Sequence, residues 1–334
     1  MAVFTEVSPD QAQDLLSTLG LGEVTALDGI KGGIENTNYF VSASEDGQPA
    51  QTYVLTLFER LSAKQLPFYL SLMQHLAAQG IAVPNPKADS SGAILHTVAG
   101  KPAALVNKLA GKSQLAPQTV HCAELGKTLA HMHLAGQSFE MVQPNLRGLN
   151  WWNDTVPTVL PHTTEPQRAL LLQELALQNH VAASSAYAAL PRGPVHADLF
   201  RDNVMFEGDT LTGVFDFYFA GVDAWLFDLS VCLNDWATHL DTGEWDLPRA
   251  QALLDAYQAV RPLTTAEREL LNPMLRAAGL RFWISRLWDF YLPREASMLK
   301  PHDPTHFERI VRERATKPLE LLAQGTSAGE PVVA

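Results

Sequence analysis

One stretch, residues 195–220, places the strongest constraint on what this chain can fold into. It reads VHADLFRDNVMFEGDTLTGVFDFYFA and contains two short apolar runs, residues 204–206 and 214–215. The segment between these runs holds Gly208 and Asp209, which are common turn formers. Two apolar runs joined by a Gly/Asp turn are typical of a β-hairpin, so we expect a hairpin here.

Four polar residues surround this hairpin: His196, Asp198, Asn203 and Asp216. Four residues separate Asp198 from Asn203, which gives the H-x-D-x-x-x-x-N order of a kinase-type catalytic loop. Asp216 opens an Asp-Phe-Tyr triplet, in the place where protein kinases have Asp-Phe-Gly. Order and spacing together indicate phosphoryl transfer.

The chemistry of phosphoryl transfer explains why these residue types are needed. Mg²⁺ prefers oxygen ligands, so we expect Asn203 and Asp216 to hold it beside the phosphates of ATP. A carboxylate that binds no metal can orient the acceptor hydroxyl and take its proton, and we assign this role to Asp198. His196 is expected to pack and hydrogen-bond within the loop and so brace it. The alternative is a surface hairpin whose Asp and Asn residues are ordinary turn formers.

Several blocks of sequence carry a resemblance to a known family. They read GGIENTNYFV, YVLTLFE, HADLFRDNVMF and DLSVCLNDW, between residues 32 and 236, and RFWISRLWDF follows from residue 281. Together they resemble the phosphotransferase family that includes the aminoglycoside and choline kinases, and more narrowly the homoserine kinases of that family. The resemblance implies ATP and Mg²⁺ as cofactors and L-homoserine as the small-molecule substrate, in threonine biosynthesis. It also implies that Asp228 binds and steadies the catalytic loop.

The fold expected from the resemblance is a two-lobed, protein-kinase-like α+β fold. We place a small N-terminal lobe with an antiparallel sheet at residues 1–106, and a larger, mainly helical C-terminal lobe at 107–324. Residues 325–334 are small and polar and are expected to be a disordered tail. Apolar patterning predicts strands at 24–30, 38–43 and 52–58, and helices at 64–79, 121–134 and 166–189.

The nucleotide is expected to lie between these lobes. A Gly-Gly turn after the first strand lets backbone N–H groups approach a phosphate, and the segment after residue 105 has the look of a hinge whose backbone would bind adenine. The expected nucleotide-binding residues are Gly32, Gly33, Asn36, Thr37, Asn38, Thr56, Val106, Asn107 and Leu109.

The third strand departs from the wider kinase pattern. Thr56 stands where kinases of this class usually place a Lys or Arg that pairs with the phosphates. Homoserine kinases look similar at this position, so the departure favours that subgroup. The cationic partner of the phosphates is left open among Lys31, Arg60 and Lys64.

The acceptor pocket is less constrained by sequence. Asn234 and Asp235 lie on one helix turn that fits an ammonium group, although a capped helix surface would look the same. Arg281 and Arg286 are five residues apart on a later helix, so at most one of them reaches a substrate carboxylate. We expect Arg281 at the acceptor, with a surface salt bridge as the alternative.

Composition excludes several classes of function. The formal net charge of −12 argues against a nucleic-acid partner. The N-terminus shows no secretory signal, and no apolar stretch approaches the roughly 18 residues of a membrane span. We therefore expect a cytoplasmic protein with no membrane partner; the oligomeric state is left open. With only Cys122 and Cys232 present, no disulfide framework is expected.

Two other motifs are rejected on spacing. A P-loop would need Gly at position 106, which is Val106. His131 and His133 lie two apart on a predicted helix and so point to different faces, which argues against a zinc site. We instead expect His133 to be a core histidine bonded near the catalytic loop.

Three functional alternatives stay open at this point. The first is a kinase for another alcohol, such as an aminoglycoside or choline; choline would need an aromatic cage, whereas an amino-acid kinase needs a cation for the carboxylate. The second is a catalytically inactive nucleotide-binding module, motivated by the missing strand lysine. The third is a metal-dependent hydrolase that uses His196 and Asp198.

Overall fold

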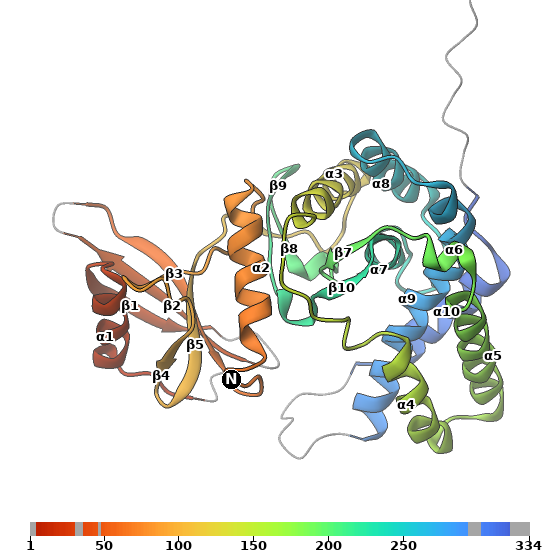
Figure 1. Cartoon of the computed structure of the whole chain (residues 1–334), viewed down its shortest axis with the longest axis horizontal. Helices are drawn as coiled ribbons and strands as arrows, with labels where there is room; N and C mark the ends of the chain where they lie inside the picture. The colour runs from red at the N-terminus through yellow and green to blue at the C-terminus, as the bar shows by residue number, and fades with distance from the viewer. Residues whose placement is uncertain (1–4, 31–35, 46–47, 293–301, 321–334) are drawn as a thin grey trace, which may run out of the picture.

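The computed structural model describes residues 5–30, 36–45, 48–292 and 302–320. Within these residues the chain forms a small part with a sheet and a larger, mostly helical part, which lie side by side in Figure 1. The two-lobed kinase-like fold predicted from the sequence is confirmed. The glycine turn at Gly32 and Gly33, and the candidate cation Lys31, lie outside the described residues, as does the predicted tail at 325–334.

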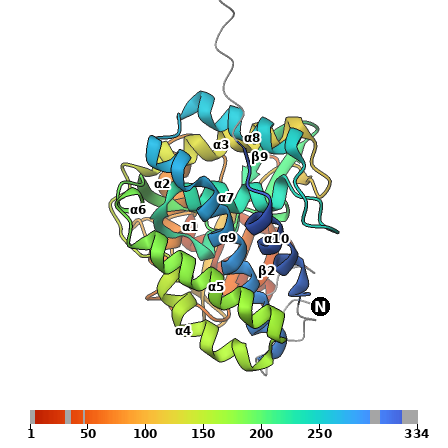
Figure 2. The same cartoon turned by 90° about the vertical axis from the view of Figure 1, so that its right-hand side faces the viewer.

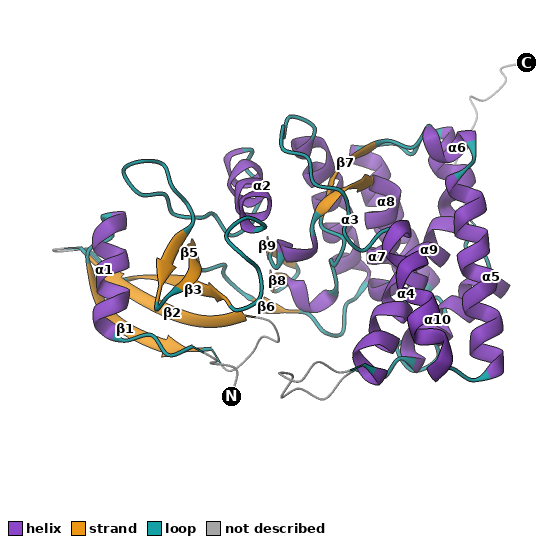
Figure 3. Cartoon of the chain, turned by 60° about the horizontal axis from the view of Figure 1, so that its bottom comes forward, coloured by secondary structure: helices purple, strands orange, loops and turns teal. Residues whose placement is uncertain are grey.

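A five-stranded antiparallel sheet organises the N-terminal part, with strand order β1-β2-β3-β5-β4. Its elements are α1 (Pro9–Leu19), β1 (Glu23–Gly29), β2 (Asn36–Ser44), β3 (Gln51–Phe58), α2 (Leu66–Ala78), β4 (His96–Val98) and β5 (Lys101–Asn107). Figure 3 shows the longer strands gathered at this end of the molecule, with α1 on one side of the sheet. In Figure 1, α2 lies between the sheet and the larger part.

Alternation along the strands decides which residues face the larger part. Tyr39, Leu55 and Leu105 belong to a core cluster that includes Leu15 and Leu16 of α1. Successive strand residues point to opposite faces, so the residues between them face α2. Phe58 and Ala104 accordingly belong to the second, larger core cluster, which also contains α2 and most of the helical part. The core therefore continues across residues 106 and 107, where we placed the lobe boundary.

The larger part is built around α7, all of whose residues are buried. Its helices are α3 (Thr119–Gly136), α4 (Leu149–Val159), α5 (Glu165–Ala182), α6 (Ser185–Ala188), α7 (Trp225–Trp236), α8 (Leu247–Val260), α9 (Thr265–Tyr291) and α10 (Thr305–Thr316). Two small sheets accompany them, one of β6 (Lys112–Ser113), β8 (Val204–Glu207) and β9 (Thr210–Val214), the other of β7 (Arg192–Val195) and β10 (Gly221–Ala224). Figure 2 shows α7 inside this part, with α9 beside it.

The helix predicted at 166–189 is two helices, α5 and α6, because the chain leaves the helix at Ala183 and Ser184 caps a new one. The helix predicted at 64–79 begins two residues later, at Leu66. In the part of the chain that the structure describes, no helix has both the length and the apolar character needed to cross a membrane.

Close packing between α3 and α8 gives a test of the fold. A Cβ atom added at Gly126 of α3 would overlap the carbonyl oxygen of Leu253 in α8. We expect Gly126→Ala to lower the free energy of unfolding by about 1–3 kcal/mol, because two backbones would have to separate. Denaturant unfolding measures this change.

Gly136→Ala is the matched control on the same helix. The nearest atom to its added Cβ would be Pro194 Cδ at 3.4 Å, an ordinary contact. This substitution should change the free energy of unfolding by less than about 1 kcal/mol. Equal losses in the two variants would contradict the packing described here.

Candidate active site

The hairpin predicted at the centre of the chain is present. β8 and β9 pair in antiparallel fashion from Val204↔Val214 to Glu207↔Thr210. At the open end of the hairpin the backbone N–H of Phe215 donates to the carbonyl of Asn203, at 3.0 Å. This bond brings the two candidate metal ligands, Asn203 and Asp216, to the same end of the hairpin.

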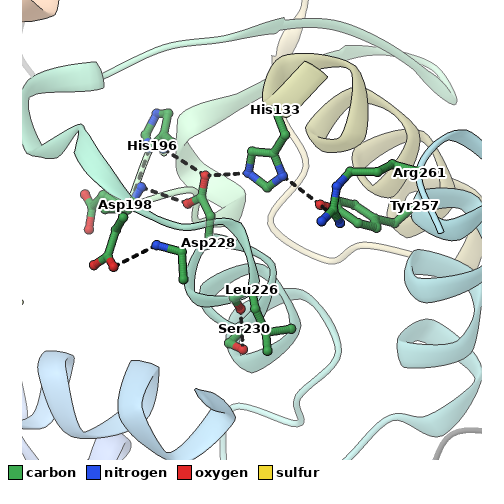
Figure 4. Close-up of polar contacts among 11 residues, drawn as sticks. His133, His196, Asp198, Leu226, Asp228, Ser230, Tyr257 and Arg261 are labelled. Carbon is green, nitrogen blue, oxygen red and sulfur yellow. Dashed lines mark hydrogen bonds and ion pairs between the residues drawn. The ribbon is translucent and has the colours of Figure 1, made fainter. Parts of the chain in front are cut away.

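A buried carboxylate on α7 holds the loop that precedes the hairpin. Asp228 is fully buried, and its two oxygens accept the backbone N–H groups of His196 and Ala197, each at 2.8 Å (Figure 4). Ala197 has a φ of 63°, a left-handed conformation that costs a residue with a side chain roughly 1–2 kcal/mol. The bonds to Asp228 offset this cost and set the direction in which Asp198 leaves the backbone. The loop-steadying role predicted for Asp228 is confirmed.

His196 ties the same loop to the strand that leads to Asp216. The backbone N–H of Asp198 donates to His196 Nδ1 at 3.3 Å, and His196 Nε2 lies 2.9 Å from the carbonyl oxygen of Phe215. A neutral ring satisfies both contacts, and burial lowers the pKa of His196. These contacts fit the bracing role predicted for His196.

A chain of buried polar groups extends behind Asp228 (Figure 4). His133 Nε2 lies 3.3 Å from Asp228 Oδ2, and His133 Nδ1 lies 2.7 Å from the hydroxyl of Tyr257. Arg261 donates to that hydroxyl at 3.0 Å and to Glu267 Oε1 at 2.7 Å. The predicted core role of His133 is confirmed. Sequence analysis missed the last three residues, because they come from α8, the following loop and α9, and no local pattern links them to the catalytic loop.

A second tie joins the other end of the catalytic loop to α7. Asp235 Oδ2 accepts from the backbone N–H of Arg201 at 2.8 Å and from its Nε at 3.1 Å. Asn234 Nδ2 donates to the carbonyl of Leu275 at 2.8 Å, and its Oδ1 accepts from Arg314 Nε at 2.9 Å. The two residues expected at an acceptor are thus used inside the protein, Asp235 as a loop brace and Asn234 between helices.

Asn203 presents an oxygen suited to a cation. Its Nδ2 donates to the backbone carbonyl of Asp198 at 2.8 Å, which leaves Oδ1 as the atom available to a metal ion. Asp216 supplies a carboxylate from the residue after Phe215. An amide oxygen and a carboxylate are hard donors, so this pair fits Mg²⁺.

The expected nucleotide residues on β2 and β3 divide between the two faces of the sheet. Thr56 Oγ1 donates to Asn38 Oδ1 at 2.7 Å on the face toward α2. Tyr218, the last residue of the Asp-Phe-Tyr triplet, packs edge-on against Phe58 of β3 with ring centroids 5.0 Å apart, and burial raises the pKa of that tyrosine. Thr37 points to the other face, where its hydroxyl donates to Glu59 Oε1 at 2.7 Å. The end of β3 therefore contacts the loop of Asp216 through Phe58.

The hinge candidates run from the end of β5 to the hairpin. Asn107 Oδ1 accepts from the backbone N–H of Asn85 at 2.7 Å, which fixes the end of the strand. Leu109 packs directly on β9, since a Cβ at Gly213 would lie 2.6 Å from Leu109 Cδ1. The segment from Val106 to Leu109 thus passes between the N-terminal sheet and the hairpin.

Arg281 is brought to the candidate base. It lies on α9, and its Nη1 atom is 3.9 Å from Asp198 Oδ1. Both side chains are mostly buried. Asp198 keeps 16% of its side-chain surface exposed, so a small molecule can reach it.

Comparison with known proteins gives one family and one fold. Residues 27–263 match the phosphotransferase enzyme family. The homoserine kinase of Polaromonas naphthalenivorans is 62% identical, covering 95% of this chain and 99% of that protein. The homoserine kinase of Cupriavidus necator is 58% identical and covers 94% and 96%. The solved amicoumacin kinase hAmiN has a TM-score of 0.66 at 16% identity, covers 91% and 92%, and shares the fold.

The anchoring role of Asp228 is testable without an activity assay. Asp228→Asn would set an N–H group against one of the two backbone N–H groups that the carboxylate now accepts. We expect a loss of about 1–3 kcal/mol in the free energy of unfolding and faster amide hydrogen exchange at residues 196–198. Asp223→Asn is the control, because this second, mostly buried carboxylate bonds the side chains of Asn145 and Arg192, at 2.9 and 3.2 Å, rather than the backbone of residues 196 and 197. Faster exchange at 196–198 in both variants would argue against a specific anchor.

The buried histidine predicts a pH dependence of stability. Burial lowers the pKa of His133 below its ordinary 6.5, so the unfolded chain binds this proton more readily than the folded protein. Stability contributed by neutral His133 is therefore present above about pH 6.5 and declines as the pH falls below it. We expect the free energy of unfolding, measured in urea, to fall less between pH 7 and pH 5 for His133→Gln than for the wild type. Parallel pH curves would show that His133 does not take part.

Proposed function

The chain belongs to the phosphotransferase enzyme family, and within this family we propose that it transfers the γ-phosphoryl group of ATP to the hydroxyl group of L-homoserine. The observation that carries the proposal is the 62% identity to a homoserine kinase over 95% of the chain. An acceptor of this kind is a small amino acid with one free hydroxyl. The product is O-phosphohomoserine.

ATP is proposed to lie between the N-terminal sheet and the β8–β9 hairpin. In this arrangement adenine contacts the backbone of residues 106–109, and the phosphates point toward the hairpin's open end. Asn38 and Thr56 are on the sheet face that borders this space, whereas Gly32 and Gly33, predicted to bind the phosphates, lie outside the described residues. The structure of amicoumacin kinase, which shares the fold, is a complex with AMP-PNP and Ca²⁺, and this supports a nucleotide and a divalent cation. In this proposal the boundary between the nucleotide-binding lobe and the catalytic lobe lies between residues 106 and 107.

Asn203 Oδ1 and the carboxylate of Asp216 are proposed to hold Mg²⁺. When bound there, the ion neutralises charge on the phosphate oxygens. The residues of the chain contribute the geometry: Asn203 is fixed by its bond to the carbonyl of Asp198, and Asp216 follows the strand residue that His196 contacts. The ligands and the base are thus positioned by the same few bonds.

Asp198 is proposed to orient the homoserine hydroxyl and to accept its proton. As the hydroxyl oxygen bonds to the γ-phosphorus, the bond between that phosphorus and the bridging oxygen of ADP breaks. The proton passes to the Asp198 carboxylate, and the products are O-phosphohomoserine and ADP. His196 and Asp228 act only through the position of the loop.

Two substitutions separate the base from the metal ligand. Asp198→Asn should lower kcat by roughly 10²–10⁴-fold, because the amide cannot accept the proton. Asp216→Asn should instead raise the Mg²⁺ concentration needed for half-maximal activity, because a neutral amide holds the ion more weakly. Steady-state kinetics over a range of Mg²⁺ concentrations distinguishes the two. Near-wild-type turnover in Asp198→Asn would remove this residue from the mechanism.

ADP release tests the substrate directly. Mg·ATP would be supplied with L-homoserine, with choline, with an aminoglycoside or with no acceptor. A signal with homoserine alone supports the proposal. A signal with another acceptor keeps the mechanism and discards the substrate, and bound ATP without turnover would favour an inactive nucleotide-binding module.

A further inference from the structure

Arg281 has a donor that the described part of the protein does not use. Its side chain is only 5% exposed, and its Nε has no hydrogen-bond partner among the described residues. The nearest carboxylate contact is from Nη1 to Asp198 Oδ1, at 3.9 Å, which is ion-pair range but too long for a hydrogen bond. A buried charged donor without a partner is costly, so its retention beside Asp198 indicates a ligand.

The guanidinium of Arg281 lies over two aromatic rings. Its central carbon lies 3.8 Å from the centroid of Phe282 and 5.2 Å from that of Phe219. Stacking of this kind restricts rotation of the group, so the edge that carries Nε keeps one direction. Burial lowers the pKa of Arg281 to about 10, which leaves the side chain charged at neutral pH. A fixed, charged edge is suited to a carboxylate that accepts two parallel bonds.

Further cations gather around this site. Arg147 and Arg286 both act electrostatically on Arg281. Arg147 lies over the ring of Trp151 at 4.4 Å, and Arg286 lies over Phe307 at 4.8 Å. The carboxylates of Asp198 and Asp289 act on Arg281 in the opposite sense, so charges of both signs lie around its guanidinium.

We propose that Arg281 binds the α-carboxylate of the acceptor and that, without a carboxylate, the same guanidinium attracts Asp198 away from the acceptor hydroxyl. The inference rests on the proposed function and names the group that selects the substrate. The carboxylate of an amino-acid acceptor pairs with Arg281, so Asp198 can bind the acceptor hydroxyl. With an alcohol that has no carboxylate, the Nε donor of Arg281 stays unsatisfied, and the alcohol hydroxyl must compete with Arg281 for Asp198. Selection thus combines an attractive contact with a penalty for the wrong acceptor.

The test compares two acceptors that differ only in the carboxylate. L-Homoserine and 3-amino-1-propanol would be assayed by ADP release with the wild type and with Arg281→Met. We expect kcat/KM for homoserine to fall roughly 10²–10³-fold, because the bound carboxylate loses its partner. For 3-amino-1-propanol we expect kcat/KM to rise, because Asp198 is released. A loss in the same proportion for both acceptors would overturn the proposal.

Two further variants test whether the effect is specific to the guanidinium of Arg281. Arg281→Lys keeps the charge but lacks the two parallel N–H donors of the guanidinium. It should fold as the wild type does, and its kcat/KM for homoserine should be about tenfold lower. It carries the test if Arg281→Met does not fold. Arg286→Met, five residues further along α9, is the matched control. It should change kcat/KM for both acceptors in equal proportion. If Arg286→Met lowered kcat/KM for homoserine alone and the Arg281 variants did not, Arg286 would be the residue that binds the carboxylate. That result would overturn the inference.

The same assays separate failure of this inference from failure of the proposed function. A wild-type protein that does not phosphorylate homoserine but phosphorylates another alcohol would refute the proposed function. A wild type active on homoserine, with Arg281 variants equally impaired on both acceptors, would refute only the role of Arg281.

Discussion

The arrangement of the active site depends on one buried carboxylate. Asp228 accepts the backbone N–H groups of His196 and Ala197, and so holds Ala197 in a left-handed conformation that its side chain disfavours. The residue that follows is Asp198, whose direction is set by this turn. The carboxylate can do this because it sits on α7, a helix buried along its whole length, and because His133 supports it from behind.

Two ties from α7 hold the loop of residues 196–203 that precedes the hairpin. Asp228 binds its beginning and Asp235 binds Arg201 near its end, so a loop of few residues is held at two points by one helix. The hairpin then returns the chain to the same place, where His196 contacts Phe215. Preorganisation of this kind suits phosphoryl transfer, in which the protein mainly positions groups and balances charge. In our proposal the acceptor is selected from a separate element, α9, through Arg281.

The sequence was informative where chemistry and short spacing coincide. His196, Asp198, Asn203 and Asp216 lie within one hairpin unit, so their order alone predicts that they meet. Partners distant in the sequence could not be predicted: Asn234 bonds residues 41 and 80 positions later, and these contacts depend on how α9 and α10 pack. The list of expected nucleotide-binding residues did not separate the two faces of β2, although Thr37 and Asn38 are neighbours whose side chains point to opposite sides of the sheet. Among the described residues the Nε of Arg281 has no partner, and this depends on packing that no pattern within α9 encodes.

The most direct test of this account is a crystal structure of the protein with Mn²⁺, a non-hydrolysable ATP analogue and L-homoserine. The anomalous signal of Mn²⁺ locates the metal independently of the protein atoms. We predict the ion between Asn203 Oδ1 and Asp216, the homoserine hydroxyl within hydrogen-bond distance of Asp198, and the homoserine carboxylate on Arg281. An ion bound away from Asn203 and Asp216, or a homoserine hydroxyl that does not reach Asp198, would contradict the account.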